Sequence, residues 1–477
     1  MPKVPSKPKP KLEELIRTKP FSFQVQAFLR ARRHKRYALF MEQGTGKTLV
    51  AIGLALYHYK RNRIKRVLVV TPDSVMGEWI RQFREHAADP SVRARMLTGR
   101  LDERRRWLSR HNSDGRFLDV LIANYVSLRE LTDELVRWRP DMVILDESQK
   151  IKNRKTKQSK AAHRLGKVAR YRYILTGTPV SESPLDLWSQ YRFLDPKIFP
   201  ESYYDFQNRY AIMGGFQRKQ IKGYKRLEEF AARAHSVAYR VTKDEALDLP
   251  GTLDQIHTFE LSAEERRHYL AMHKDFLLRF SQGHVVSAPL VLTQMVKLQQ
   301  IASGFVIDEE GQVVSWPSSK LRLLKEILED IPSHRKVVIF AKFIFEIQRI
   351  ADLCRKLKIP VGVMHGETKN RQELIDQFQN TDSPRVMVLQ TSVGGLGITL
   401  TRASYAIFFS MSHSFVDYDQ ARARVYRIGQ TNKVTYLHLI ARDTIEEDIL
   451  KAVQEKRTVA DLVTNILRKQ VRFLDED

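Results

Sequence analysis

The amino-acid sequence predicts an α/β protein of two lobes, each built on a parallel β-sheet with helices on both faces. Short apolar runs rich in Val, Ile and Leu recur along the chain, and each ends in a polar or glycine-containing turn that leads into a helical pattern. Such continuous apolar strands are typical of parallel sheets that are buried on both faces. The chain of 477 residues is also too long for one ordinary core, so two domains are expected.

The apolar runs form two sets, one in each half of the chain. The first set covers residues 66–72, 119–125, 141–147 and 171–179, and the second covers residues 336–342, 360–366, 385–391, 405–410 and 434–440. Between the sets, residues from about 195 to 248 are rich in aromatic and basic side chains but show no clear strand, which indicates a helical extension of the first lobe.

These patterns predict the domain organisation. We expect a disordered basic tail over residues 1–11, a first lobe over residues 12–250 and a second lobe over residues 251–477. The boundary falls near Pro250 and Gly251, and C-terminal helices are expected over about residues 444–477.

The charge of the chain indicates a polyanionic partner. Lysine and arginine number 81 against 55 aspartate and glutamate residues, a formal net charge of +26 that is spread along the sequence. A surface of this kind attracts DNA or RNA, mainly through phosphates and without reading the base sequence. A basic surface that serves only solubility is the alternative.

Composition also excludes several classes of protein. No run of about 18 apolar residues appears, and the first residues, MPKVPSKPKPKLEE, lack the apolar segment of a secretory signal. We therefore expect an intracellular protein that is not bound to a membrane. The single cysteine, Cys354, excludes an internal disulfide framework and any multi-cysteine zinc site.

A candidate phosphate-binding loop lies in FMEQGTGKTLVAIG, residues 40–53. Glycines let consecutive backbone N–H groups turn toward an anion, a lysine adds charge near the β- and γ-phosphates, and a hydroxyl holds magnesium. Gly44 and Gly46 supply the glycines, Lys47 the charge and Thr48 the hydroxyl. Gln43 and Thr45 lie beside them in the loop and complete the predicted ATP-binding set. The usual first glycine is replaced by Met41, whose side chain can point away from the phosphates.

A candidate acidic pair ends the apolar run MVILDES. Asp146 would lie beside Mg²⁺, together with Thr48 of the loop, and Glu147 would orient the attacking water. The pair could instead be a strand-end cap. Its distance from the loop along the chain is the spacing expected if both segments end strands of one lobe.

The order of these segments resembles helicase superfamily II, and specifically its SWI/SNF-type DNA-dependent ATPases, in a compact viral or bacterial form. MEQGTGKT is similar to that branch's D-E-M-G-L-G-K-T, DESQKIKN to its D-E-A-H followed by x-I-K-N, and LTGTPVSESPLDLWSQYRFLDP to its L-T-G-T-P segment. QTSVGGLGITL and DQARARVYRIGQ resemble S-T-x-A-G-G-x-G-I-N-L and Q-A-x-x-R-x-H-R-I-G-Q. The resemblance runs from about Phe21 to about Lys456 and implies two RecA-like lobes that use ATP and Mg²⁺.

The resemblance implies roles for further residues. Arg424 and Arg427 would be the arginine fingers at the γ-phosphate, with Gln420 in the same motif, and Gly397 would belong to the ATP site. Charge on a transferring phosphoryl group is stabilised by a guanidinium in any such enzyme. A basic helix without this role is the alternative.

Upstream of the loop, PFSFQVQAFL resembles a motif in which a glutamine reads adenine. Gln24 takes that position here, and an amide can donate and accept in one plane against a base edge. Gln26 is a competitor, and a glutamine on a helix surface is the simpler interpretation. The acidic box also departs from the branch, because Ser148 and Gln149 occupy the positions that couple it to the L-T-G-T-P segment.

Nucleic-acid contacts in this superfamily come from strand-end loops of both lobes, which hold the phosphate backbone without reading bases. The corresponding positions here are Thr71, Pro72, Gly99, Arg100, Asn124, Ser127, Lys342, His365, Gly366 and Thr391. Each of them could instead cap a helix or close a turn.

These observations lead to one functional hypothesis and two rivals. The first is an ATP-dependent translocase on duplex or branched DNA, without sequence specificity, acting in replication, recombination or repair with proteins of those processes and as a monomer. The second is a helicase that separates DNA or RNA strands. The third is a nucleotide-gated clamp on nucleic acid with little turnover, against which Glu147 and both arginines argue.

Overall fold

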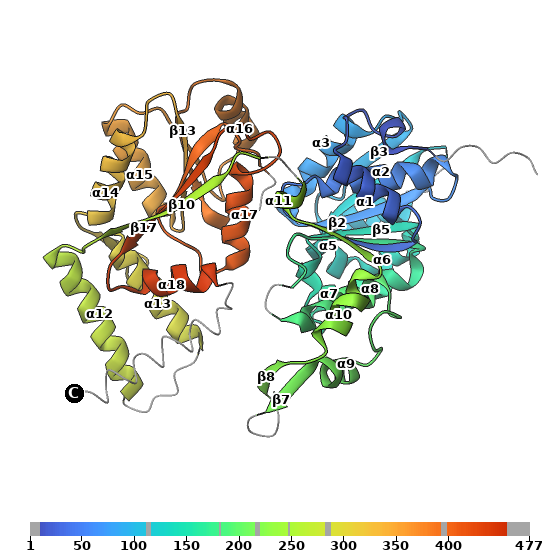
Figure 1. Ribbon diagram of the computed structural model, residues 1–477, viewed down its shortest axis with the longest axis horizontal. Coiled ribbons are helices and arrows are strands. Elements are labelled where there is room, and N and C mark those ends of the chain that lie inside the picture. Colours follow the sequence, from blue (N-terminus) through green and yellow to red (C-terminus); the bar gives the residue numbers. More distant parts are fainter. Residues whose placement is uncertain are drawn as a thin grey trace, which may run out of the picture. The chain divides into compact units, whose positions relative to one another are not determined.

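The computed structural model describes residues 10–110, 116–180, 183–214, 220–246, 249–281, 288–392 and 398–455. The chain divides into two compact units, Met1–Leu247 and Asp248–Asp477, close to the boundary expected at Pro250 and Gly251 (Figure 1). Most of the expected basic tail, residues 1–9, lies outside the described residues, as do residues 456–477 of the expected C-terminal helices.

Unit 1 is built on a seven-stranded parallel sheet with the order β3-β4-β2-β5-β6-β1-β9. The strands in that order are Val92–Met96, Leu118–Asn124, Arg66–Thr71, Met142–Asp146, Tyr171–Leu175, Arg36–Met41 and Ala238–Val241. All four apolar runs predicted in the first half of the chain are strands of this sheet. Their side chains are almost wholly buried, as expected for strands covered on both faces.

Helices cover both faces of the unit 1 sheet. One core joins the strands to α5 (Tyr125–Glu130), α6 (Thr132–Trp138), α7 (Lys157–Val168) and α8 (Leu187–Leu194). On the other face lie α1 (Ser22–Ala31), α2 (Lys47–Lys60) and α3 (Met76–His86). Every residue of α2 from Leu49 to His58 is buried, because this helix packs between the sheet and α1. Helix α4 (Leu101–Arg110) follows β3.

The extension of unit 1 contains the expected helices, α9 (Tyr203–Tyr210) and α10 (Leu227–His235), followed by the short α11 (Lys243–Ala246). It also contains strands that the sequence did not indicate. β7 (Ala211–Gly214) and β8 (Gln220–Tyr224) form an antiparallel hairpin, and β9 joins the main sheet beside β1. Four-residue strands are too short to show a periodic pattern, and β9 is defined by its pairing with a strand far away in the sequence.

Unit 2 is built on a six-stranded parallel sheet with the order β10-β17-β16-β13-β15-β14. The strands in that order are Thr252–Phe259, Val434–Ala441, Ala403–Phe408, Lys336–Ala341, Val386–Gln390 and Val361–Met364. All five runs predicted in the second half are strands here. β10 was not predicted, because it is an exposed edge strand of polar composition.

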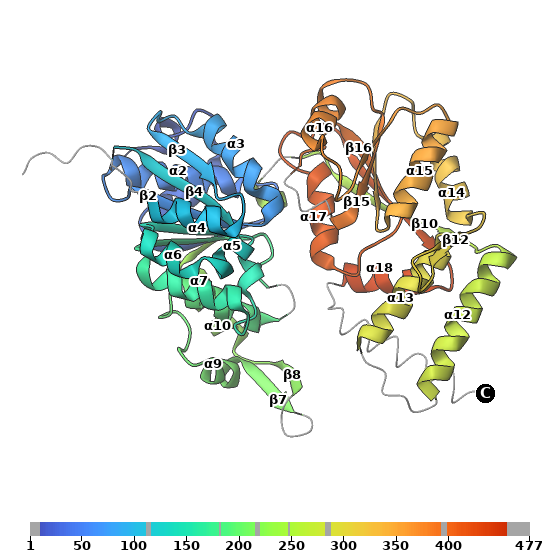
Figure 2. The same ribbon diagram turned by 180° about the vertical axis from the view of Figure 1, so that it is seen from behind.

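Two cores cover the unit 2 sheet. One joins it to α14 (Ser319–Asp330) and α15 (Ile344–Lys356), which Figure 2 shows next to each other. The other joins it to α12 (Ala263–Ser281), α13 (Ala288–Ala302), α16 (Arg371–Asn380), α17 (Phe415–Val425) and α18 (Ile445–Gln454). A small hairpin, β11 (Phe305–Ile307) with β12 (Val313–Ser315), follows α13. Two α/β lobes with parallel sheets are therefore confirmed. Among the described residues, none of the helices is both long and apolar enough to cross a membrane.

Candidate active site

The phosphate-binding loop predicted from the sequence connects β1 to α2. Met41 ends β1 with its side chain fully buried, so its carbonyl rather than its side chain faces the loop. That carbonyl accepts a hydrogen bond from Lys47 Nζ at 2.9 Å, and the carbonyl of Glu42 accepts from the same ammonium group at 3.3 Å. These two hydrogen bonds hold the Lys47 side chain against the start of the loop.

Two glycines of this loop have left-handed backbones, Gly44 with φ 85° and Gly46 with φ 79°. A Cβ atom on Gly46 would lie 2.4 Å from Nε2 of Gln24, so both conformation and space require glycine there. Gly44, Gly46, Lys47 and Thr48 remain partly exposed, which suits groups that receive a phosphate.

Gln43 and Thr45, by contrast, are buried and hold the loop in place. Gln43 packs on Gly177, where an added Cβ would lie 3.0 Å from Gln43 Cγ. The Thr45 hydroxyl donates to the carbonyl of Glu42 at 2.7 Å. Both side chains thus contribute to packing in the loop, and Gly177 of the L-T-G-T-P segment forms its wall.

The side-chain amide of Gln24 also contacts the loop. Its Oε1 accepts from the backbone N–H of Phe21 at 3.0 Å, and its Nε2 donates to the carbonyl of Thr45 at 2.9 Å. Gln24 is 2% exposed, whereas the competitor Gln26 is exposed. Its contact with the predicted phosphate-binding loop distinguishes Gln24 from Gln26. The role of Gln24 in reading adenine stays a prediction.

Asp146 ends β5, and three donors hold its carboxylate. Oδ2 accepts from Trp79 Nε1 at 2.8 Å and from the Thr71 hydroxyl at 3.0 Å, and Oδ1 accepts from the backbone N–H of Glu147 at 3.0 Å. Burial, reinforced by the negative charge of Glu147, raises the Asp146 pKa to about 6, against the opposing effects of Trp79, Lys47 and Thr71.

Glu147 follows in a left-handed backbone conformation, with φ 50° and ψ 52°. This region is strained for a residue with a side chain, and such strain gathers at functional sites. The Glu147 side chain is partly exposed, and its Oε2 accepts from Gln149 Nε2 at 2.5 Å. The backbone thus turns Glu147 away from the core while Asp146 stays inside.

The altered acidic box is coupled to the L-T-G-T-P segment through Gln190. The Ser148 hydroxyl donates to Gln190 Oε1 at 2.7 Å, and Gln190 Nε2 donates to the carbonyl of Pro179 at 2.8 Å. Ser148 therefore performs the coupling that its position predicted, by way of a third residue. The sequence carried no signal for Gln190, which lies in helix α8.

The arrangement of donors fits Mg²⁺. β1 and β5 are separated in the sheet only by β6, so Thr48 and Asp146 lie at the same edge. The Asp146 carboxyl is buried beside a second carboxylate, and a cation would relieve this unfavourable charge. Within the described residues no group of three His, Cys, Asp or Glu side chains could hold a metal alone. Mg²⁺ is usually bound by one or two protein oxygens together with substrate phosphates.

The residues assigned to the ATP site of unit 2 gather around α17. Arg424 is 9% exposed, and its carbonyl accepts from the backbone N–H of Leu400 at 2.9 Å. Arg427 donates to the carbonyl of Ile398 at 3.2 Å, and Gln420 is half-buried on the same helix as Arg424. Gly397 lies outside the described residues.

The strand-end positions of unit 1 follow three neighbouring strands, β3, β4 and β2. Thr71 and Ser127 are both fully buried. The Thr71 hydroxyl donates to Asp146, and the Ser127 hydroxyl accepts from Arg104 at 2.6 Å. Asn124 caps α5 through the N–H of Ser127. Gly99 and Arg100 are exposed, and Pro72 is half-buried. Thr71, Asn124 and Ser127 therefore have internal partners, and contact of the set with nucleic acid stays a prediction.

The strand-end positions of unit 2 follow three neighbouring strands as well, β13, β15 and β14. Lys342 donates to Gln299 Oε1 at 2.6 Å, and burial lowers its pKa to about 8. Thr391 is buried and donates to the carbonyl of Ala341 at 3.2 Å. His365 is half-buried and Gly366 is exposed.

Trp79 is the functional candidate that sequence reasoning missed. It is 1% exposed on α3, and only its spacing with other apolar residues marks it in the sequence. That spacing predicts a core residue and gives no sign of the hydrogen bond to Asp146.

Comparison with known proteins places this chain in a family. The SNF2-related domain matches residues 25–304, and the helicase conserved C-terminal domain matches residues 319–429. The chain is 27% identical to an uncharacterized ATP-dependent helicase of Mycoplasma pneumoniae, over 91% of this chain and 40% of that protein. It is 29% identical to the putative ATP-dependent helicase/translocase YwqA of Bacillus subtilis, over 88% of this chain and 46% of that protein.

Among solved structures, the chain is similar to the Sulfolobus solfataricus SWI2/SNF2 ATPase core in complex with dsDNA. The two are 28% identical with a TM-score of 0.45, over 92% of this chain and 91% of that chain. The chain spans less than half the length of the two curated relatives named above.

The family match confirms the resemblance found in the motifs. The SNF2-related domain alone covers more than half of the chain, and the helicase C-terminal domain follows it. This protein therefore belongs to the family that carries the SNF2-related domain followed by the helicase conserved C-terminal domain.

Proposed function

We propose that this protein is a DNA-dependent ATPase that moves along duplex DNA. The observation that carries the proposal is the environment of Asp146. Both side chains that bind its Oδ2, Thr71 and Trp79, come from the β2–α3 segment, which also carries predicted contacts to the DNA backbone. If DNA binding displaced that segment, the displacement would change the hydrogen bonds to the Asp146 carboxylate, which is predicted to face the nucleotide.

In the proposed reaction, unit 1 binds and hydrolyses ATP. The glycine turn and Lys47 bind the phosphates, and Glu147 orients the attacking water. Thr48 and Asp146 would hold Mg²⁺, which neutralises phosphate charge when bound. Arg424 and Arg427 stabilise charge that develops on the γ-phosphate.

Movement would follow from unequal grip on DNA in the ATP-bound and ATP-free states. A ligand shifts a conformational equilibrium only by its difference in affinity for the two states, so DNA must bind one of them better. The strand-end positions of both units would hold phosphates, and the charge of +26 supports a sequence-independent contact. Branch migration, remodelling or removal of bound proteins in replication, recombination or repair would use such movement.

The test combines ATPase rates with a translocation assay. Turnover is measured without nucleic acid and with duplex DNA, single-stranded DNA or RNA, alongside displacement of a triplex-forming strand from a duplex. We expect stimulation by duplex DNA together with triplex displacement. A strong preference for single strands or RNA would contradict translocation and favour a strand-separating helicase. Nucleotide-dependent binding without turnover would favour a clamp.

A further inference from the structure

Unit 1 carries a cluster of positive charge at the edge of its sheet opposite the predicted phosphate-binding loop. Residues 30–36 read RARRHKR and residues 60–66 read KRNRIKR, with five lysines or arginines and no acidic residue in each. We call these segments the two arginine turns. One leads into β1 and the other into β2, so both lie at the amino edge of the parallel sheet.

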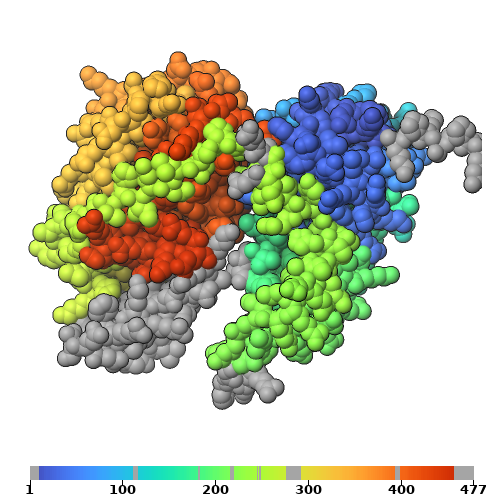
Figure 3. Space-filling model, viewed as in Figure 1, coloured from blue at the N-terminus to red at the C-terminus, as the bar shows by residue number. Residues whose placement is uncertain are grey.

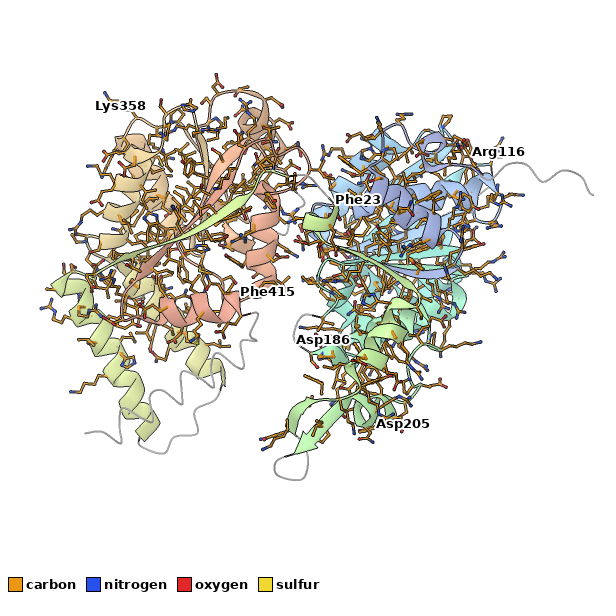
Figure 4. The ribbon with its side chains drawn as sticks, viewed as in Figure 1. Phe23, Arg116, Asp186, Asp205, Lys358 and Phe415 are labelled. Atoms are coloured by element: carbon orange, nitrogen blue, oxygen red, sulfur yellow. The ribbon has the colours of Figure 1, made fainter. Side chains whose placement is uncertain are left out.

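The amino edge is well separated from the site described above. β1 has six residues, which corresponds to about 20 Å between its two ends. The carbonyl of Arg116, just before β4, accepts from the Tyr59 hydroxyl at 2.9 Å, which ties that loop to the end of α2. Figure 4 shows Arg116 and Asp186 on opposite sides of unit 1. The segment around α1, dark blue in Figure 3, lies open on the surface.

The two turns meet around a pocket of about 300 Å³, lined by Arg32, Arg33, Tyr57 and Arg63. Arg32 and Arg61 both lie over the Tyr57 ring, at 5.6 and 5.8 Å from its centre. Within the described chain, neither Arg33 nor Arg63 forms an ion pair with a carboxylate.

The positive charge at this edge is compensated only in part, because Arg36 of the first turn forms an ion pair with Asp195 at 2.8 Å. Asp141 contacts the second turn, but its carboxylate accepts from the backbone N–H groups of Lys65 and Arg66. Arg63, Arg170 and Arg61 add to the effect of burial and lower the pKa of His58 to about 3. A neighbouring carboxylate of comparable strength would have opposed that shift.

We propose that this pocket binds phosphates of a second nucleic-acid segment, separate from the one held at the strand ends. Guanidinium groups match phosphate oxygens in a planar fork. Protein–nucleic-acid interfaces are polar and strongly positive, whereas protein partners are usually anchored by apolar or aromatic residues. None of the exposed large apolar side chains of the described residues lies in the two turns. A nucleic acid is therefore a better match than an acidic protein.

The test is the number of short duplexes that the full chain binds. A 12-base-pair DNA duplex is titrated into the protein by calorimetry, with and without the double substitution R33A/R63A. We expect two duplexes per unaltered chain and one per R33A/R63A chain. R33K/R63K keeps the charge and should retain two, the second bound more weakly because the fork is lost.

A matched control removes the same charge elsewhere. K325A/K356A lies on exposed helical positions of unit 2 and should still bind two duplexes. One duplex on the unaltered chain, or equal numbers on the unaltered chain and R33A/R63A, would overturn the proposal. Binding of a polyglutamate peptide that R33A/R63A abolishes, with the duplex number unchanged, would overturn it in favour of an acidic protein. Duplex-stimulated ATPase of the unaltered chain, measured in parallel, tests the proposed function independently.

Discussion

The turn after β1 in unit 1 and the turn after β13 in unit 2 both lead from a parallel strand to a helix, and of these two turns only the first has the geometry of an anion site. In unit 1, Gly44 and Gly46 take left-handed conformations between the strand and α2. In unit 2, β13 passes into α15 through Lys342 and Phe343, neither of which has a positive φ.

The N–H groups of the unit 2 turn already have an anion. Those of Lys342 and Phe343 donate to Glu346 Oε2 at 3.2 and 3.1 Å, and Glu346 is 2% exposed. A carboxylate from the following helix thus takes the place that a phosphate would need. This difference indicates that a strand-to-helix turn offers a location for an anion, whereas left-handed glycines suit that location to a phosphate.

The largest expected effect is that of Lys47→Ala. Loss of the ammonium group should weaken ATP binding and abolish turnover, because no other group of the loop supplies positive charge to the phosphates. Fluorescent-ATP titration and phosphate release measure the two effects. Lys342→Ala changes the turn after β13 in unit 2 and should leave ATP binding in place. Normal turnover in Lys47→Ala would remove the loop from the mechanism.

Glu147→Gln should retain ATP binding and lose turnover by about 10²- to 10⁴-fold, the usual contribution of a positioned acid–base group. The amide keeps the shape of the side chain but cannot accept a proton. Single-turnover hydrolysis compared with equilibrium ATP binding separates the two steps. An unchanged hydrolysis rate would contradict the assignment of the acidic pair.

Trp79→Phe should weaken Mg²⁺-dependent nucleotide binding. The substitution removes one hydrogen bond to a buried carboxylate, which is worth about 1.5–3 kcal/mol, or roughly 10- to 150-fold. The Mg²⁺ concentration for half-maximal binding of fluorescent ATP measures the effect. Trp188→Phe also removes one indole hydrogen bond, to the carbonyl of Pro200, and should leave that concentration unchanged. Equal behaviour of the two variants would show that Trp79 only fills space.

Gln24→Ala should lower ATP affinity by roughly 5- to 30-fold, because two hydrogen bonds worth about 1 kcal/mol each are lost at the loop. Since the observed contacts are to the loop, GTP affinity should fall by the same factor. A loss confined to ATP would show instead that Gln24 reads adenine. The exposed Gln26 supplies the control, and Gln26→Ala should bind both nucleotides normally.

The smallest expected effect concerns the pH dependence of DNA binding through Lys342. Burial lowers its pKa to about 8, so its positive charge is present below pH 8 and lost above it. The DNA concentration for half-maximal ATPase stimulation should therefore rise a few-fold between pH 7 and pH 9. Lys342→Arg stays charged and should flatten this dependence. An identical pH profile in both proteins would exclude Lys342 from the contact.

Much of the fold could be predicted, and a candidate nucleotide site could be identified, because the signals are local. Nine apolar runs were expected as strands, and all nine are strands of the two sheets. The loop from Gly44 to Thr48 and the pair Asp146 and Glu147 were identified from contiguous residues. The strands β3, β7, β8, β9, β10, β11 and β12 were not predicted, because they are short or lie at exposed edges.

The sequence by itself determined where phosphate chemistry can occur, because backbone conformation and the type of charge are properties of adjacent residues. Only the tertiary structure decided what supports that chemistry. Thr71 and Trp79 hold Asp146, Gln24 and Gly177 confine the loop, and Glu346 accepts the N–H groups of the turn after β13. Most of these contacts join residues far apart in the chain, and many side chains could satisfy the same donor or acceptor. Which one does so depends on the packing of the whole unit.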